Sequence, residues 1–64
     1  MKYNSVNEIG VGDTVTFQER EHMVLVNYII GQTDKTGYTP NTNRTILIDT
    51  QGNKTVVNDF TQLS

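Results

Sequence analysis

The sequence predicts a small all-β domain in which a few short antiparallel strands curl into a barrel. The chain has 64 residues and is 34% hydrophobic, which is enough for one small core and not for two. Its apolar residues alternate with polar ones or gather in short β-branched runs, and none of them shows the longer period of an amphipathic helix. We therefore expect a single domain over residues 1–64.

The first expected strand covers residues 9–17. Its apolar side chains share one parity of the sequence: Ile9, Val11, Val15 and Phe17. Asp13 interrupts this face directly after Gly12, which predicts a bend or bulge where the short carboxylate accepts a hydrogen bond from a nearby backbone N–H. Residues 1–8 are mostly polar and lack a period, so we expect a loose lead-in there.

A polar connection over residues 18–21 separates this strand from the run Met23–Ile30. The run is apolar on both parities and rich in β-branched residues. This pattern is typical of a central strand that is covered on both faces, or of one that bends between two half-sheets. A helix is less favoured, because the run is short and Gly31 ends it at once.

The clearest hairpin lies between Thr45–Asp49 and Lys54–Asn58. Gly52 and Asn53, in the connection, tolerate the positive φ angles that tight antiparallel turns require. Both flanking segments are rich in Ile and Val. The alternation and the turn residues therefore agree on two paired strands.

A single 3₁₀ turn is expected near the C-terminus. Asn58 or Asp59 would begin it, and Phe60 and Leu63 would enter the core. A flat sheet of four to five such strands would expose one apolar face, whereas a curled sheet brings its two apolar sides together and shortens the exposed edges. The strand pattern therefore predicts a barrel.

The opening segment Ile9-Gly10-Val11-Gly12-Asp13-Thr14-Val15 resembles the entry of SH3-like small barrels, including the Tudor-like and KOW-like modules of bacteria and phages. The resemblance extends from Ile9 to Leu63 and implies an SH3-like barrel of four to five antiparallel strands. The chain contains no Trp and lacks the Ala-Leu-Tyr-Asp-Tyr-like stretch of eukaryotic SH3 domains. Recognition of proline-rich peptides is therefore not implied.

The charge pattern favours neither duplex nucleic acid nor a membrane as partner. The formal net charge is -2, and the basic residues are scattered through the chain: Lys2, Arg20, Lys35, Arg44 and Lys54. Nucleic-acid-binding proteins usually gather such residues on one face. The run Met23–Val26 is far shorter than the about 20 residues that span a bilayer, so we expect a cytoplasmic protein.

No catalytic, cofactor or metal site is predicted. His22 lies near Glu19 and Glu21, which would suit a metal or a general base, but a tight turn scatters neighbouring side chains. We therefore expect His22 in a solvated hairpin. There is no Cys, and Gly10 and Gly12 are not followed by the Lys and Ser or Thr of a phosphate loop.

The long polar segment 31–44 is the main candidate for a binding site, because long ordered loops often carry function. Tyr38, close to Pro40, would form a rigid aromatic anchor, and Lys35 and Arg44 would pair with a carboxylate or phosphate. The residues predicted to contact a partner are Tyr28, Lys35, Tyr38, Pro40 and Arg44. Two alternatives remain: a mobile polar loop, and an aromatic platform for bases formed by Tyr3, Phe17 and Tyr28.

The sequence is therefore expected to encode a non-catalytic binding module with another protein as its partner, such as a phage or small bacterial regulatory protein. It would use the 31–44 loop and an exposed strand edge, where a partner strand can add. Homo-oligomerisation through the same edge is a further expectation. The alternatives are nucleic-acid or nucleotide binding through the loop, and a very small metal-assisted enzyme around His22.

Overall fold

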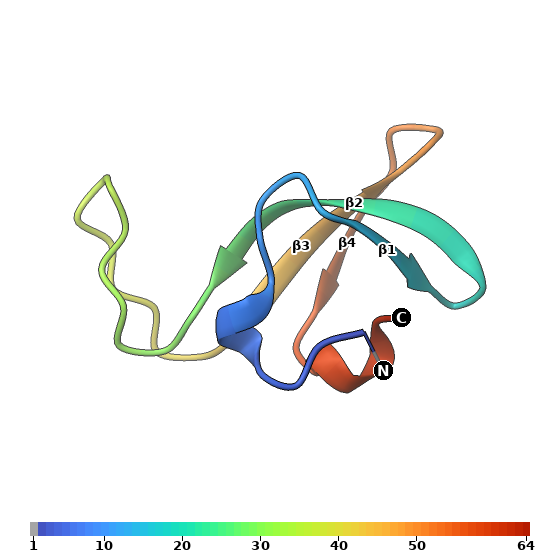
Figure 1. Ribbon diagram of the computed structural model, residues 1–64. Helices are drawn as coiled ribbons and strands as arrows, with labels where there is room; N and C mark the ends of the chain where they lie inside the picture. The colour runs from blue at the N-terminus through green and yellow to red at the C-terminus, as the bar shows by residue number, and fades with distance from the viewer. Residues whose placement is uncertain (1) are drawn as a thin grey trace.

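A single antiparallel sheet with two flanking 3₁₀ turns makes up the computed structural model, which describes residues 2–64 (Figure 1). The elements are η1 (Val6–Glu8), β1 (Thr14–Phe17), β2 (Arg20–Tyr28), β3 (Arg44–Asp49), β4 (Lys54–Val57) and η2 (Phe60–Gln62). Neighbours in sequence are neighbours in the sheet, whose order is β1-β2-β3-β4. The prediction of a predominantly β chain with four antiparallel strands is confirmed. No helix among residues 2–64 has the length and apolar character needed to cross a membrane.

The turn between β1 and β2 is tighter than the sequence predicts. It consists of Gln18 and Glu19, whose φ angles are 52° and 66°, and Phe17 pairs with Arg20 across it. Two consecutive positive φ angles match the right-handed twist of a hairpin. The expected connection over residues 18–21 is therefore too long, because neither turn residue is the Gly or Asn that usually marks such a turn.

A register shift bends β2 in its middle. Val24 pairs with Leu47 while Val26 pairs with Ile46, so Leu25 is an extra residue opposite β3. Because adjacent residues of β3 face opposite sides of the sheet, Val24 and Val26 also face opposite sides. Of the two interpretations of this apolar run, the bending strand is the one observed.

The β3–β4 hairpin forms where the sequence predicts it. Gly52 adopts a φ of 87°, and the Asp49 carboxylate accepts hydrogen bonds from the backbone N–H groups of Gln51 and Asn53 at 2.8 and 2.9 Å. These two bonds lower the pKa of Asp49, the donation from Asn53 most strongly. The carboxylate therefore holds the turn in shape.

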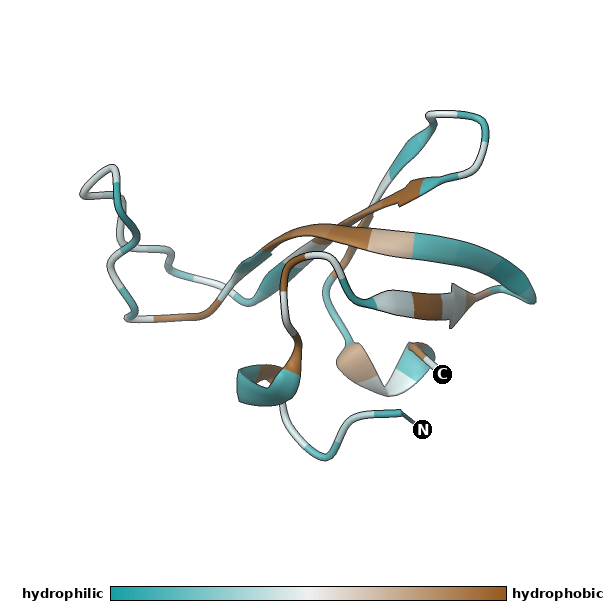
Figure 2. Ribbon diagram, turned by 45° about the horizontal axis from the view of Figure 1, so that its top comes forward, coloured by the Kyte–Doolittle hydropathy of each residue, from teal (hydrophilic) through white to brown (hydrophobic). Residues whose placement is uncertain are grey.

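The core lies on the inner face of the sheet, and Figure 2 shows both 3₁₀ turns and the described ends of the chain on that side. It consists of Tyr3, Ile9, Val15, Val24, Leu47, Val57 and Leu63. Phe60, which was expected in the core, and Phe17, from the apolar face of the first expected strand, pack against it while partly exposed. η2 follows the prediction, since Asp59 caps it by accepting a hydrogen bond from the Thr61 N–H.

Residues 2–8 are packed against the sheet and do not form the expected loose lead-in. Tyr3 is buried, and the Lys2 N–H donates to the Leu63 carbonyl at 3.2 Å. The Asn27 side-chain amide donates to the Val6 carbonyl at 2.8 Å. Four short strands cannot cover their own inner face, so the polar N-terminal segment supplies a buried ring.

The bend predicted at Asp13 is present and also anchors this segment. The Asp13 carboxylate accepts hydrogen bonds from the Gly10 N–H at 2.9 Å and from the Tyr3 hydroxyl at 2.7 Å. Burial, followed by this bond, raises the pKa of Tyr3 to about 12. Because the chain turns here, with Gly12 at a φ of 90°, β1 begins at Thr14 and not at Ile9.

The sheet is open rather than closed, since β1 and β4 do not pair with each other. The free side of β1 is partly occupied by the end of the chain. Thr16 and Ser64 exchange two backbone hydrogen bonds at 2.8 and 2.9 Å. The C-terminal residues therefore extend the sheet beyond β1 by one paired position.

Candidate functional site

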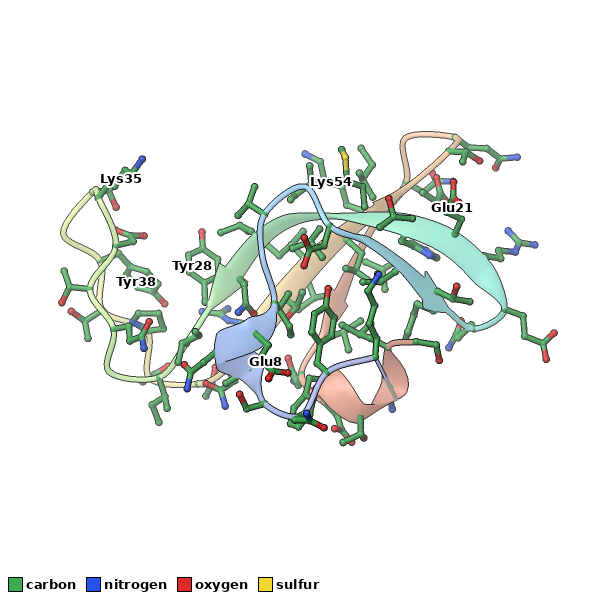
Figure 3. All side chains as sticks on the ribbon, viewed as in Figure 1. Glu8, Glu21, Tyr28, Lys35, Tyr38 and Lys54 are labelled. Carbon is green, nitrogen blue, oxygen red and sulfur yellow. The ribbon has the colours of Figure 1, made fainter. Side chains whose placement is uncertain are left out.

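Tyr28, Tyr38 and Arg44 form one cluster at the end of the sheet, which we call the tyrosine–arginine cluster. Tyr28 and Arg44 face each other as the last residue of β2 and the first of β3. Tyr38 reaches them from the intervening loop, and its ring stands edge-on to the Tyr28 ring at 5.6 Å and 85° (Figure 3). The structure thus brings together three of the five residues predicted to contact a partner.

The Arg44 guanidinium is held by both rings. Its Cζ lies 5.8 Å from the centre of the Tyr28 ring, within the range of a cation–π contact. One Nη2–H donates to the Tyr38 hydroxyl at 2.9 Å. Because a guanidinium has five N–H donors, it retains the capacity to bind an anionic or carbonyl group. The buried Nε has no acceptor among the described residues.

The segment between β2 and β3 folds back on itself as a narrow arm. The Gly31 N–H donates to the Pro40 carbonyl at 3.0 Å, and the Asp34 N–H donates to the Tyr38 carbonyl at 2.9 Å. Between these two bonds, the hydroxyls of Thr33 and Thr39 lie 2.7 Å apart. The arm therefore has a hydrogen-bonded backbone path that positions Tyr38.

Asp34 organises the tip of the arm, a role that the sequence interpretation missed. Its Oδ1 accepts hydrogen bonds from the Thr36 hydroxyl at 2.6 Å, the Thr36 N–H at 2.9 Å and the Tyr38 N–H at 3.0 Å. The pattern Asp-x-Thr is the available signal, since it recurs at Asp59 and Thr61 with the same two bonds to the threonine.

Acid is expected to loosen the tip of the arm. The bond from the Thr36 hydroxyl is the strongest of the effects that lower the pKa of Asp34 below its usual value. A carboxyl group of this kind stabilises the fold above its unfolded pKa of about 4, and that contribution is lost as the pH falls through the lower folded pKa. The amide NMR signals of Thr36 and Tyr38 are therefore expected to move toward unfolded values as the pH falls below about 4.

The Asp34→Asn variant is the control for this titration, because its amide oxygen still accepts hydrogen bonds and does not ionise in this range. Its Thr36 and Tyr38 signals should show a much smaller change over the same interval. Signals that stay constant in the unmodified protein down to pH 2 would contradict a stabilising role for the ionised carboxylate.

Lys35 and Pro40 lie apart from the cluster. Lys35 is exposed at the tip of the arm, and Figure 3 shows its side chain pointing away from Tyr28 and Tyr38. Pro40 is buried, so its ring supports the arm and does not provide the predicted contact surface. Lys35 and Pro40 are close to Tyr38 in the sequence but lie apart from the cluster, because the arm folds back between Gly31 and Pro40.

His22 is buried within β2, which corrects the expectation of a solvated hairpin. Because the turn takes only two residues, His22 faces the inner side opposite Val15 and is 6% exposed. Its Nδ1 donates to the Arg20 carbonyl at 2.9 Å, and its ring stands edge-on to Phe17 at 5.7 Å. Among residues 2–64, no group of three or more His, Asp or Glu side chains is placed to hold a metal ion.

The aromatic platform suggested by the sequence is not formed. Tyr3 and Phe17 lie in or against the core, whereas Tyr28 belongs to the tyrosine–arginine cluster. The register shift at Leu25 turns Tyr28 to the outer face of the sheet, whereas Phe17 and Tyr3 lie on the inner side. Base stacking on Tyr3, Phe17 and Tyr28 together is therefore ruled out by their positions.

On the outer face of the sheet, opposite the core, further rows of cross-strand neighbours follow the cluster. The first of these rows is Val26–Ile46–Val56 and the next is Met23–Ile48–Lys54. Met23 is 45% exposed and Val56 is 56% exposed. A hollow of about 250 Å³ borders Met23 and Ile48 at the far end of this face. The sequence interpretation missed this surface, because the strand runs were assigned to a curled core.

No protein-family model matches the chain, and no curated protein or solved structure shows a significant similarity to it.

Proposed function

We propose that this protein is a non-catalytic binding module that recognises another protein through the tyrosine–arginine cluster. The observation that carries the proposal is the preassembly of Tyr28, Tyr38 and Arg44 on the surface, joined by an edge-on ring pair and a 2.9 Å hydrogen bond. Tyr and Arg are the residues that most often dominate protein interfaces, and a preassembled site loses little side-chain entropy on binding.

A protein partner is favoured over nucleic acid or a nucleotide. Arg44 is the one basic side chain in the cluster, while Lys35 lies away from it at the tip of the arm. With a formal net charge of -2, the chain offers little of the phosphate neutralisation from which nucleic-acid affinity mainly arises. An exposed strand edge would provide a second contact with the partner protein.

The proposal includes an SH3-like barrel as the family of the fold and a regulatory role, as in small phage or bacterial modulators of larger host proteins. Four antiparallel strands, a 3₁₀ turn after β4 and the paired positions Thr16 and Ser64 support the SH3-like assignment. The surface cluster supports a regulatory role, because it offers a preassembled site for recognising a larger protein.

The Tyr38→Ala variant tests the cluster. Proteins retained from a lysate of the source cell by the immobilised wild-type chain are identified, and the affinity of a recovered partner is then measured by calorimetry. The substitution is expected to weaken binding by about 2 kcal/mol, or roughly 30-fold in Kd, because it removes the exposed ring and the hydroxyl that orients Arg44.

Lys35→Ala is the matched control, since it truncates an exposed side chain of the same arm that lies outside the cluster. It is expected to leave the Kd within about twofold. Equal affinities of wild type and Tyr38→Ala would show that the cluster is not part of the interface. A Kd that rises steeply with salt, together with loss of retention after nuclease treatment, would favour the nucleic-acid alternative.

A further inference from the structure

The two outer strands of the sheet differ in how their free edges are occupied. On β1, Thr16 exchanges two hydrogen bonds with Ser64. On β4, the backbone makes no hydrogen bond on the side away from β3 within the described part of the chain. An edge of this kind is a template for another strand. β4, Lys54–Val57, is therefore the exposed edge of this molecule.

The register of the β3–β4 hairpin identifies the free backbone groups. The Asp49 N–H donates to the Asn53 carbonyl at 3.0 Å, and hydrogen-bonded positions recur at every second residue of an antiparallel pair. Thr55 and Val57 therefore bond to β3. Lys54 and Val56 direct their N–H and C=O groups outward, where an added strand would meet them.

The same two residues present exposed side chains on the outer face. Val57 is 3% exposed and belongs to the core, so Val56, which is 56% exposed, lies on the other face together with Lys54. The Lys54 ammonium group has no side-chain hydrogen bond to any described residue, and Figure 3 shows it standing clear of the sheet. A strand added at β4 would thus have an apolar neighbour and a cationic neighbour two residues apart.

We propose that β4 binds an extended strand of a partner protein that carries an apolar side chain beside Val56 and a carboxylate beside Lys54. This inference rests on the proposed protein-binding function and names the partner's chemistry at its second contact. The apolar side chain would continue the row Val26–Ile46–Val56. The carboxylate would continue the row that ends at Lys54, since oppositely charged cross-strand neighbours stabilise a pairing.

A second copy of this chain fits the edge less well. In a two-fold symmetric antiparallel pairing, a residue with outward backbone groups lies opposite another residue with outward backbone groups. Lys54 would then face Lys54, Val56 or Asn58 of the second copy. None of these is acidic, and Asp59 has the wrong parity to lie opposite Lys54. The charge of Lys54 therefore favours a different chain that supplies an acidic residue.

The test is a titration of the ¹⁵N-labelled protein with short peptides, followed by NMR. The probe Thr-Thr-Val-Thr-Glu-Thr-Thr, running antiparallel to β4, places its valine beside Val56 and its glutamate beside Lys54. We expect it to shift the amide signals of Lys54 and Val56 and to slow their hydrogen exchange. A peptide with lysine in place of glutamate should bind at least about threefold more weakly, and Lys54→Glu should reverse this preference.

Val56→Pro provides an independent control. The backbone N–H of Val56 points away from β3, and proline lacks this group. The substitution therefore removes a hydrogen bond to the added strand and none to β3. We expect loss of peptide binding with the core signals of Leu47 retained. If that variant does not fold, the charge reversal in Lys54→Glu remains a complete test by itself.

Three results would overturn the inference: equal binding of the two peptides, shifts confined to β1, or no binding at all. Concentration-dependent shifts of the Lys54 and Val56 amides without peptide would also overturn it, because they would assign the edge to a second copy. Tyr38→Ala should leave peptide binding unchanged. A failure at β4 is therefore distinguishable from a failure of the tyrosine–arginine cluster, which the Tyr38→Ala affinity measurement reports.

Discussion

Val57→Asp is expected to unfold the protein, whereas Val56→Asp leaves it folded. The two valines are neighbours in β4, but Val57 is 3% exposed and Val56 is 56% exposed. An unpaired carboxylate at Val57 would be buried in the core, at a cost of several kcal/mol. A single domain of this size rarely has more than about 3–5 kcal/mol of stability, so this cost is enough to unfold it.

Circular dichroism and urea denaturation would measure the difference. Val56→Asp should lose about 1 kcal/mol or less, which reflects the poor strand propensity of Asp. A cooperative unfolding transition of Val57→Asp close to that of the wild type would contradict the orientation of β4. All assignments of residues to the outer face would then need to be reversed.

Leu63→Ala is expected to reduce the free energy of unfolding by about 2–5 kcal/mol, which is the usual cost of removing a buried leucine side chain. Leu63 is fully buried although it is the penultimate residue. Its carbonyl accepts the hydrogen bond from the Lys2 N–H, and the next residue pairs with Thr16. The side chain therefore anchors both ends of the described chain to the core.

Gln62→Ala is the matched control, since Gln62 is the exposed neighbour of Leu63. It should change the stability by no more than about 0.5 kcal/mol. The urea midpoints of the two variants should differ clearly at similar slopes. Equal midpoints would indicate that residues 63 and 64 are not part of the folded unit, which would also remove the partial cover of the β1 edge.

The two proposed contacts lie on one face of the sheet. The tyrosine–arginine cluster lies at one end of this face, and the row Val26–Ile46–Val56 lies beside it. A partner that adds a strand at β4 would therefore lie close to Arg44, which faces the same side as Val56. Hydrogen-bonded strands and a hydrogen-bonded arm position both proposed contacts, so we expect binding to require little ordering of this chain.

The strands and turns followed from local patterns. Alternating apolar residues, the β-branched run and Gly52 predicted four strands and the hairpin, and Asp13 after Gly12 predicted the bend, because each feature depends on residues that are close in sequence. The turn at Gln18 and Glu19 had no such signal, since neither residue favours positive φ. Because of that error, His22 was predicted to lie in a solvated hairpin, whereas it is buried.

The candidate site depended on contacts between distant residues. The loop pattern singled out Tyr38 and Arg44, but the role of Asp34, the burial of Pro40 and the outward position of Lys35 follow from how the arm folds back. The packing of Tyr3 and the inner or outer orientation of each valine likewise depend on the bulge at Leu25 and on residues 2–8 covering the sheet. Local sequence encodes which segments extend and turn, while the face that each side chain occupies is settled only when the whole chain buries its few apolar groups together.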